Sequence, residues 1–241
     1  MAREMLEIPT TEQLKVSGEM VGGLAHKIRN PLAAMKLSME VILAESELQE
    51  KDRLVLLNVV EEIRRIELLV KKFLNFARPA AAQLMTLNIN KVLDETAKYL
   101  EKQPAFAQPA SGRKIVREFT AGLPDTEGDP QQLQQVFLNL LLNAAEAMPA
   151  GGTVTVKTWC DAAARLVGID VSDTGAGVPK EAVERIFQPF FTTKAKGIGL
   201  GLAVAKRLVE EHGGTIMVTN CQPEGTTFRV VFPSQPPPKL A

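Results

Sequence analysis

Ala25-His26-Lys27-Ile28-Arg29-Asn30-Pro31-Leu32 places an isolated histidine inside a long helical pattern. Apolar residues around it recur at spacings of three and four, which predicts one buried helical stripe: Val21, Leu24, Ile28, Leu32, Met35, Met39 and Ile42. At about 100° per residue, His26 falls roughly opposite Leu24 and Ile28 and is expected to face solvent. Asn30, one turn further on, shares that face. By itself, such a histidine is an ordinary solvated surface residue.

A second apolar repeat follows a polar break at residues 45–52. Its members alternate at spacings of three and four, the heptad seam of a helix that packs on another helix: Leu56, Val59, Ile63, Ile66, Val70, Phe73 and Ala77. We predict two long helices joined as an antiparallel hairpin. Because a lone hairpin covers only half of each stripe, two chains are expected to pair into a dimeric four-helix bundle.

Beyond residue 87 the pattern changes to strands mixed with shorter helices. We predict strands at 114–120, 153–160, 166–172, 215–220 and 226–232, and helices at 90–102, 130–148, 180–186 and 200–211. Asp129 and Pro130 mark the start of one helix as its N-cap and first helical residue. The fold class is therefore α plus α/β, a helical hairpin followed by an α/β sandwich with a mixed sheet.

These changes divide the chain into five segments. Residues 1–10 form a lead, 11–78 the hairpin, 79–86 a linker, 87–233 the sandwich and 234–241 a disordered tail, part of it expected to be vector-derived.

Composition excludes several classes of function. The 28 basic and 28 acidic residues balance, so we expect neither nucleic-acid binding nor membrane contact. The two cysteines, Cys160 and Cys221, lack the spacing of a metal site and suit a reduced, cytoplasmic protein. No apolar run reaches the roughly 18 residues of a membrane span, and no signal peptide is found.

Two segments of the sandwich carry polar side chains next to apolar elements. In Asn139–Ala147, Asn139 and Asn143 stand four residues apart on one helical face. An amide oxygen is a ligand suited to Mg²⁺, although a polar helix seam explains the pair equally well. In Asp173-Thr174-Gly175-Ala176-Gly177, the carboxylate follows a strand and can accept a hydrogen bond from an amine. An ordinary exit from a strand into a turn is the alternative.

Two further segments are rich in phenylalanine or glycine. Phe187-Gln188-Pro189-Phe190-Phe191-Thr192-Thr193-Lys194 joins an apolar anchor to hydroxyls and a cation, as in a phosphate-facing loop or a loop pinned on the core. Gly197-Ile198-Gly199-Leu200-Gly201-Leu202 opens a helix, and glycines at a helix N-terminus suit an anion. It is neither a P-loop nor a Rossmann fingerprint.

Taken together and in this order, the segments resemble the bacterial sensor histidine kinases of two-component systems. Residues 20–36 are similar to the family's H-box, 139–147 to its N-box, 173–177 to its G1 box, 187–194 to its F-box and 197–202 to its G2 box. The resemblance covers residues 12 to 233 and implies that the chain is a catalytic core, with residues 1–10 ending a linker from a missing sensor. It implies a cytoplasmic fragment, although the full-length protein can be membrane-anchored through that missing region.

The resemblance also implies roles for individual residues. His26 would accept the γ-phosphoryl group of ATP and pass it to an aspartate on a response regulator, and Asn30 would position the water for dephosphorylation of that regulator. Asn143 would bind Mg²⁺, supported by Asn139. Asp173 would read the adenine amine in a pocket shaped by Gly175 and Gly177. The remaining cofactor-binding residues would form the lid near the phosphates and the glycine-rich segment that lets it close: Thr192, Thr193, Lys194, Lys196, Gly197, Gly199, Leu200 and Gly201.

Lys27 departs from the family's pattern, which usually has Glu or Asp directly after the histidine as a base. A cation cannot accept the imidazole proton and disfavours a developing imidazolium. Three explanations stay open: natural variation, an engineered change, or a kinase weakened toward phosphatase action or ATP binding alone. A related ATPase of the same nucleotide-binding superfamily is a further alternative. His212, at a helix C-terminus, is interpreted as a favourable contact with the helix dipole.

Overall fold

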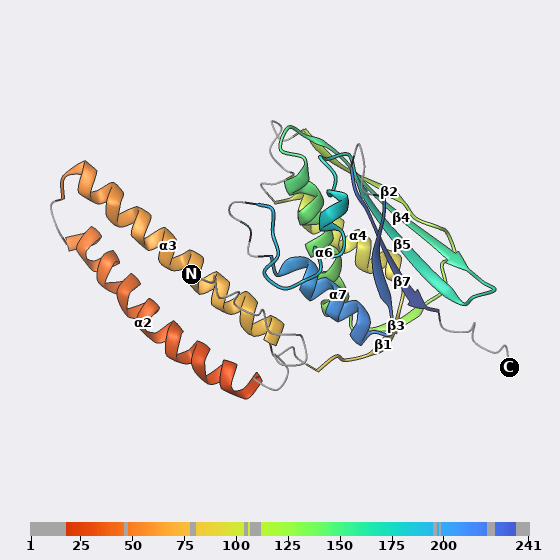
Figure 1. Ribbon diagram of the computed structural model, residues 1–241, viewed down its shortest axis with the longest axis horizontal. Coiled ribbons are helices and arrows are strands. Elements are labelled where there is room, and N and C mark those ends of the chain that lie inside the picture. The colour runs from red at the N-terminus through yellow and green to blue at the C-terminus, as the bar shows by residue number, and fades with distance from the viewer. Residues whose placement is uncertain are drawn as a thin grey trace, which may run out of the picture. The chain divides into compact units, whose positions relative to one another are not determined.

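The computed structural model describes residues 18–45, 48–77, 81–103, 106, 112–194, 197, 199–220 and 225–234. Within these ranges, the side chains of residues 18–27, 29, 45, 68, 71–77 and 220 lie outside the description. The chain divides into two compact units, Met1–Ala81 and Ala82–Ala241 (Figure 1). A helical unit followed by an α/β unit with a mixed sheet confirms the predicted fold class.

The first unit is an antiparallel helical hairpin of α2 (Gly18–Glu45) and α3 (Glu50–Ala77). Among the hairpin side chains that the structure describes, the buried apolar ones are Leu32 of α2 and Val60 and Ile63 of α3.

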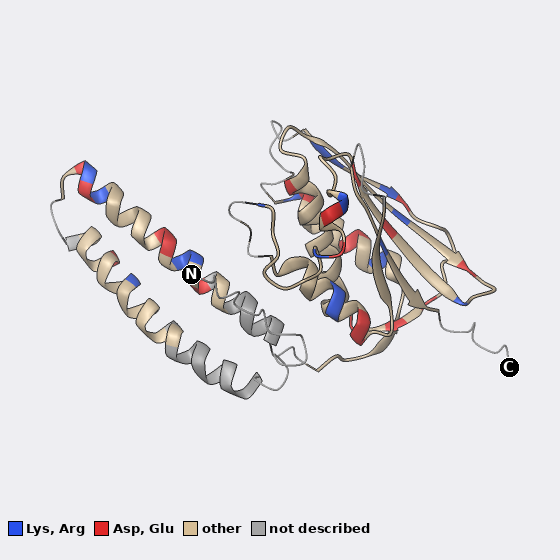
Figure 2. Ribbon diagram, viewed as in Figure 1, with Lys and Arg blue, Asp and Glu red and all other residues tan. Residues whose placement is uncertain are grey.

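Ion pairs also join the two helices. Lys36 Nζ lies 3.7 Å from Glu67 Oε2, and Arg64 Nη2 lies 3.6 Å from Glu40 Oε1. Figure 2 shows basic and acidic residues along both helices of the hairpin. Because the side chains of both pairs are in contact with solvent, each pair is expected to stabilise the hairpin only slightly.

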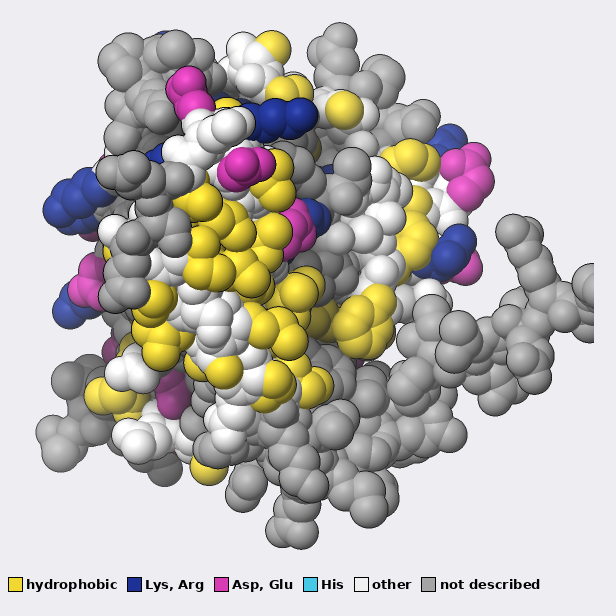
Figure 3. All heavy atoms as spheres, turned by 90° about the vertical axis from the view of Figure 1, so that its left-hand side faces the viewer, with side chains coloured by type: hydrophobic (Ala, Val, Ile, Leu, Met, Phe, Trp, Pro, Cys, Tyr) yellow, Lys and Arg dark blue, Asp and Glu magenta, His cyan; other side chains and the backbone are white. Residues whose placement is uncertain are grey.

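The apolar stripe of the first helix is only partly buried in a single chain, as expected for a lone hairpin. Leu32 is buried, but Ile28, Met35 and Ile42 are 37%, 54% and 38% exposed. Two helices can cover only one side of each other, which leaves the rest of both stripes open. Among the described side chains of the hairpin, the exposed large apolar residues are Ile28, Met35, Leu37, Val41, Ile42, Leu54, Val55, Leu57, Val59 and Ile66. Figure 3 shows apolar side chains gathered in a band on the side formed by the hairpin.

The second unit is built on a five-stranded sheet with strand order β2-β4-β5-β7-β6. The strands are β2 (Arg113–Glu118), β4 (Gly152–Asp161), β5 (Leu166–Asp173), β6 (Thr215–Asn220) and β7 (Thr227–Pro233). Only the β2–β4 pair is parallel, so the sheet is mixed.

Three helices, α4 (Ile89–Glu101), α6 (Pro130–Ala147) and α7 (Gly201–Glu211), cover one face of this sheet (Figure 1). The central helix α6 buries Phe137, Leu140 and Leu141, while Phe228 and Phe232 of β7 are buried on the sheet side of the core. Spacings of three and four place these α6 side chains on one face, and Asn139 and Asn143 on another.

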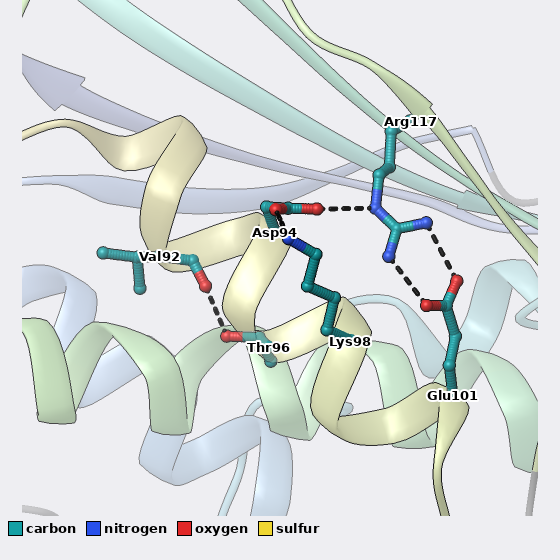
Figure 4. A network of polar contacts seen from close by, with 6 residues as sticks. All are labelled: Val92, Asp94, Thr96, Lys98, Glu101 and Arg117. Atoms are coloured by element: carbon teal, nitrogen blue, oxygen red, sulfur yellow. Dashed lines mark hydrogen bonds and ion pairs between the residues drawn. The ribbon is translucent and has the colours of Figure 1, made fainter.

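A polar network fastens α4 to the edge strand β2. Arg117 donates to Asp94 at 3.0 Å and to both carboxylate oxygens of Glu101 at 2.8 and 2.9 Å (Figure 4). Lys98 Nζ lies 2.7 Å from the other oxygen of Asp94. The two-pronged Arg117–Glu101 geometry fixes the rotation of α4 against the sheet.

Short elements differ from the prediction. A two-stranded antiparallel sheet of β1 (Met85–Leu87) and β3 (Thr126–Gly128) was not predicted. Three-residue strands show too few side chains to reveal a period of two. The helix predicted at 180–186 is a single 3₁₀ turn, Lys180–Ala182, followed by turns.

In the part of the chain that the structure describes, none of the helices combines the length and apolar character needed to cross a membrane.

Candidate functional site

The N-terminal end of α6 is held by a carboxylate that serves three backbone groups. Asp129 Oδ1 accepts hydrogen bonds from the N–H groups of Gln131 and Gln132 at 2.9 and 3.1 Å, and Oδ2 accepts from Gln83 N–H at 2.8 Å. This N-cap, with Pro130 after it, confirms the predicted start of the helix. It also fixes the orientation in which α6 presents its polar face.

Asp173 closes β5 and is 7% exposed. Its Oδ1 accepts from the backbone N–H groups of Gly175 at 2.8 Å and Thr226 at 3.3 Å. Burial raises the pKa of Asp173 above its usual value, and the N–H groups of Gly175 and Thr226, with the charge of Lys194, offset part of that rise. The second carboxylate oxygen remains to accept a hydrogen bond from a ligand.

The turn after Asp173 packs tightly on the end of α6. A Cβ at Gly175 would lie 2.6 Å from the carbonyl oxygen of Ala147, so only glycine fits there without a shift of the backbone. Gly177 has a φ of +74°, which also favours glycine. The two predicted pocket glycines therefore bring the loop close to α6 and turn it back.

The phenylalanine-rich segment is anchored at one end. The Phe187 ring packs edge-on against Phe228, with ring centroids 6.3 Å apart. Phe190 donates its N–H to Gly199 O at 2.9 Å, and a Cβ at Gly199 would lie 2.5 Å from Phe190 C. The positive φ of +71° at Gly199 and this close approach bring the phenylalanine-rich and glycine-rich segments together.

The start of α7 faces the polar side of α6. Leu200 stands at the N-cap position, is buried and supplies no side-chain cap. A Cβ at Gly201 would lie 3.8 Å from Asn139 Oδ1, so the amide of Asn139 is next to the first turn of α7. Backbone N–H groups at such a helix start carry partial positive charge and bind anions such as phosphate.

Lys194 reaches back to α6 from the end of the phenylalanine-rich segment. Its Nζ donates to Asn143 Oδ1 at 2.7 Å and to Glu146 Oε2 at 2.6 Å. Thr192 Oγ1 accepts from the Lys194 N–H at 3.1 Å, and a Cβ at Gly197 would meet that same hydroxyl at 2.4 Å. Thr192 and Thr193 are both exposed.

His212 makes a contact at the end of its own helix and a second contact that was not predicted. The imidazole is buried, and its Nδ1 lies 2.7 Å from Leu208 O in the last turn of α7. This contact is compatible with the interpretation of a favourable interaction at the helix C-terminus. The Nε2 atom accepts from Asp129 N–H at 3.0 Å, so His212 also joins the end of α7 to the start of α6.

One end of the sandwich thus collects most of the predicted cofactor-binding residues: Asn139, Asn143, Asp173, Gly175, Gly177, Thr192, Thr193, Lys194, Gly197, Gly199, Leu200 and Gly201. Lys196 lies outside the described residues. His26 and Lys27 lie on α2, but their side chains also fall outside the description. Asn30, on the same helix, is exposed as predicted. These three residues belong to the other unit.

Sequence reasoning missed two residues of this arrangement. Glu146 shares the polar face of α6 three residues after Asn143, a spacing that could have identified it. Thr226 is 3% exposed and reaches Asp173 only through strand pairing across the sheet, for which the sequence has no local signal.

The donors present suit a hard cation held jointly with a ligand. Within the described ranges, no cluster of three or more His, Cys, Asp and Glu side chains exists that would hold a metal by itself. Asn143 Oδ1 already accepts from a cation, the Lys194 ammonium, at 2.7 Å. An amide oxygen in this setting fits Mg²⁺ that takes its remaining ligands from phosphates and water.

Family models match both units. Residues 16–82 match the His Kinase A (phospho-acceptor) domain, and residues 128–236 match the histidine kinase-, DNA gyrase B- and HSP90-like ATPase domain. Among curated proteins, sporulation kinase A of Bacillus subtilis (strain 168) is 36% identical over 93% of this chain and 36% of its own length. The sensor histidine kinase ZraS of Escherichia coli (strain K12) is 34% identical over 96% of this chain and 49% of its own length. The chain thus spans about a third to a half of these relatives.

Solved structures show the same arrangement of elements. Full-length ShkA in complex with AMPPNP matches 90% of this chain and 46% of its own, with a TM-score of 0.73 and 28% identity. Histidine kinase ThkA in complex with the response regulator protein TrrA matches 95% of this chain and 65% of its own, with a TM-score of 0.64 and 27% identity.

Proposed function

The chain belongs to the sensor histidine kinases, and on this premise we propose that it moves the γ-phosphoryl group of Mg-ATP to His26 and then to an aspartate of a response regulator. The observation that carries the proposal is the convergence of the N-box, the turn after Asp173 and the start of α7 at one end of the sandwich. The helical unit supplies His26 as the acceptor of the phosphoryl group.

The adenine is held by Asp173. Backbone donors from Gly175 and Thr226 fix one carboxylate oxygen, so the other is oriented to accept from the exocyclic amine. Gly175 and Gly177 have no side chains, so a planar adenine ring can approach the backbone of this loop closely.

The triphosphate lies between α6 and α7. The uncapped N–H groups that begin at Gly201 attract phosphate oxygens. Asn143, supported by Asn139, holds the Mg²⁺, whose charge neutralises the developing negative charge of phosphoryl transfer. Lys194 and the hydroxyls of Thr192 and Thr193 act at the same end, and the family resemblance assigns Lys196 to the phosphates as well.

His26 attacks as a neutral imidazole, which is nucleophilic near neutral pH. A P–N bond forms to the γ-phosphorus, the bond to the ADP oxygen breaks, and the imidazole proton leaves to solvent or a base. Asn30, whose side chain is exposed on α2, then positions water against the aspartyl phosphate of the regulator.

Lys27 favours a second candidate function. A cation beside His26 cannot take the imidazole proton and raises the energy of an imidazolium. A kinase-impaired protein that mainly dephosphorylates its regulator would keep Asn30 and the ATP site but would transfer little phosphate from ATP to His26.

The protein works as a homodimer in the cytoplasm. The large apolar side chains that are exposed in the described part of the hairpin support pairing with a second hairpin into a four-helix bundle. The homologous ThkA was solved with a response regulator, which supports a receiver domain as partner.

Labelling with γ-³²P-ATP tests the proposal. We expect acid-labile, base-stable label on the wild type and none on His26→Ala. Equal label on both proteins contradicts the assignment of His26. ATP turnover without phosphohistidine would indicate a related ATPase, and regulator dephosphorylation without label would support the impaired kinase. Lys27→Glu is expected to raise the labelling rate at least tenfold if Lys27 limits proton removal.

A further inference from the structure

The Lys194 ammonium occupies a point where two oxygens of α6 converge. Asn143 Oδ1 and Glu146 Oε2 lie 2.7 and 2.6 Å from Nζ. The two α6 residues are three apart, so their side chains project from the same helical face. Carbonyl and carboxylate oxygens are the usual ligands of hard cations. A point within reach of one amide oxygen and one carboxylate oxygen is therefore suited to a cation.

We propose that Lys194 fills the metal position of the nucleotide-free protein, and that Glu146 is a second residue positioning the metal there. This rests on the proposed function, because the metal is the one that accompanies ATP. An ammonium 2.6–2.7 Å from both oxygens leaves no room for a divalent ion, which binds oxygen at about 2.1 Å. The metal and Lys194 are therefore alternatives.

The charges at this position explain why the metal replaces Lys194 only when the nucleotide is bound. Lys194 and Glu146 neutralise each other, whereas a divalent ion in place of the lysine leaves a net positive charge at this position. Bound phosphates supply the compensating negative charge. With the phosphates bound, the metal binds at this position more favourably than the Lys194 ammonium does. The displaced Lys194 can then bind the phosphates next to it.

The size of the effect follows from solvent exposure. The side chains of Lys194 and Glu146 are 36% and 60% exposed, so solvent screens their attraction. Removal of the competing ammonium is expected to strengthen metal binding by about 3- to 10-fold rather than by orders of magnitude.

Metal binding to the whole nucleotide-free chain tests the proposal without any reaction. Mn²⁺, a paramagnetic substitute for Mg²⁺, is titrated and the free ion measured by electron paramagnetic resonance. Lys194→Met should bind Mn²⁺ about 3- to 10-fold more tightly than the wild type, and Lys194→Met with Glu146→Gln should lose that gain. Lys180→Met and Glu184→Gln, exposed residues of the same charge, should match the wild type.

Unchanged or unmeasurably weak Mn²⁺ binding by Lys194→Met would overturn the proposal, as would a gain that survives in the double variant. Thermal melts of each variant guard against loss of folding, which is not expected for exposed side chains.

A second measurement separates this inference from the function on which it rests. ATP affinity is measured by calorimetry with Mg²⁺ and with EDTA. Glu146→Gln should reduce the ratio of the affinity with Mg²⁺ to the affinity with EDTA about 3- to 10-fold. An unchanged ratio in a protein that binds ATP refutes the role of Glu146 alone, whereas failure of the wild type to bind ATP refutes the proposed function.

Discussion

At the scale of single residues, Asp173 combines its proposed role in adenine binding with a cost to the folded state. Its pKa is raised by burial, so the ionised carboxylate is less stable in the folded protein than in the unfolded chain. That destabilisation is present at pH values above the raised pKa and disappears as the pH falls below the unfolded pKa, where the group is protonated in both states.

Asp173→Asn is therefore expected to separate stability from binding. The asparagine oxygen can keep the hydrogen bonds from Gly175 and Thr226, while the buried charge is lost. At pH 7 the free energy of unfolding in urea should stay level or rise, and ATP affinity should fall at least tenfold because the new amide donor faces the adenine amine. The stability difference from the wild type should shrink at acid pH. A variant that is less stable at pH 7 and still binds ATP normally contradicts this view.

The site residues predicted correctly as neighbours are those that helical geometry relates. Asn139 and Asn143 share one face of α6 because they are four residues apart, and this follows from the sequence. Glu146 shares that face too, but its contact with Lys194 spans 48 residues and depends on how a loop returns to the helix. The contact of His212 with the start of α6 likewise depends on a donor 83 residues away.

At the scale of elements, Asp129 joins the approach to β1, the start of α6 and the end of α7. Burial raises its pKa, but the N–H groups of Gln83, Gln132 and Gln131 outweigh this and hold the pKa below the usual value. A lowered pKa in the folded state means that the carboxylate stabilises the fold above its unfolded pKa. This contribution is lost as the pH falls through the folded value.

Asp129→Asn should accordingly lower the free energy of unfolding by about 1–2 kcal/mol at pH 7. An asparagine oxygen still caps α6, but its amide cannot accept from Gln83. Urea unfolding at a series of pH values should show the deficit shrinking below pH 4, near the ordinary pKa of aspartate. A deficit that is constant with pH contradicts a role for the charge.

The network between α4 and β2 offers a second test at this scale. Arg117 bridges Asp94 and Glu101, and its removal frees α4 from the edge strand (Figure 4). Arg117→Met should cost about 1 kcal/mol in urea unfolding, because these groups are partly solvated. Lys114→Met, on the same strand and exposed, is the control and should change little. Equal losses in the two variants argue against the network.

Some element boundaries can be predicted from local sequence patterns, and others cannot. The start of α6 was predicted to the residue because Asp129 and Pro130 act locally. The pairing of β1 with β3 was missed because it joins two three-residue segments about 40 residues apart. The order β2-β4-β5-β7-β6 is set by packing across the whole sheet, which no single segment encodes.

At the scale of the whole molecule, the hairpin presents more apolar surface than a lone pair of helices can bury. Ile63 of the predicted heptad seam packs inside the hairpin, whereas Val59 and Ile66 on the same seam are 38% and 40% exposed. Alternate members of one seam thus face inward and outward. Outward residues at this spacing fit the core of the proposed four-helix bundle, which a second chain would complete.

Ile66→Glu is expected to disrupt that association. A carboxylate in the bundle core would be buried without a partner in both chains, a cost of several kcal/mol per dimer. Light scattering after gel filtration should give the mass of a monomer for Ile66→Glu and of a dimer for the wild type. Asn58→Glu, which adds the same charge at an outward heptad position of the same helix, should remain dimeric. Because the ATP site belongs to a separate compact unit, ATP affinity should be unchanged in the monomer. A dimeric Ile66→Glu variant would place the interface on another surface.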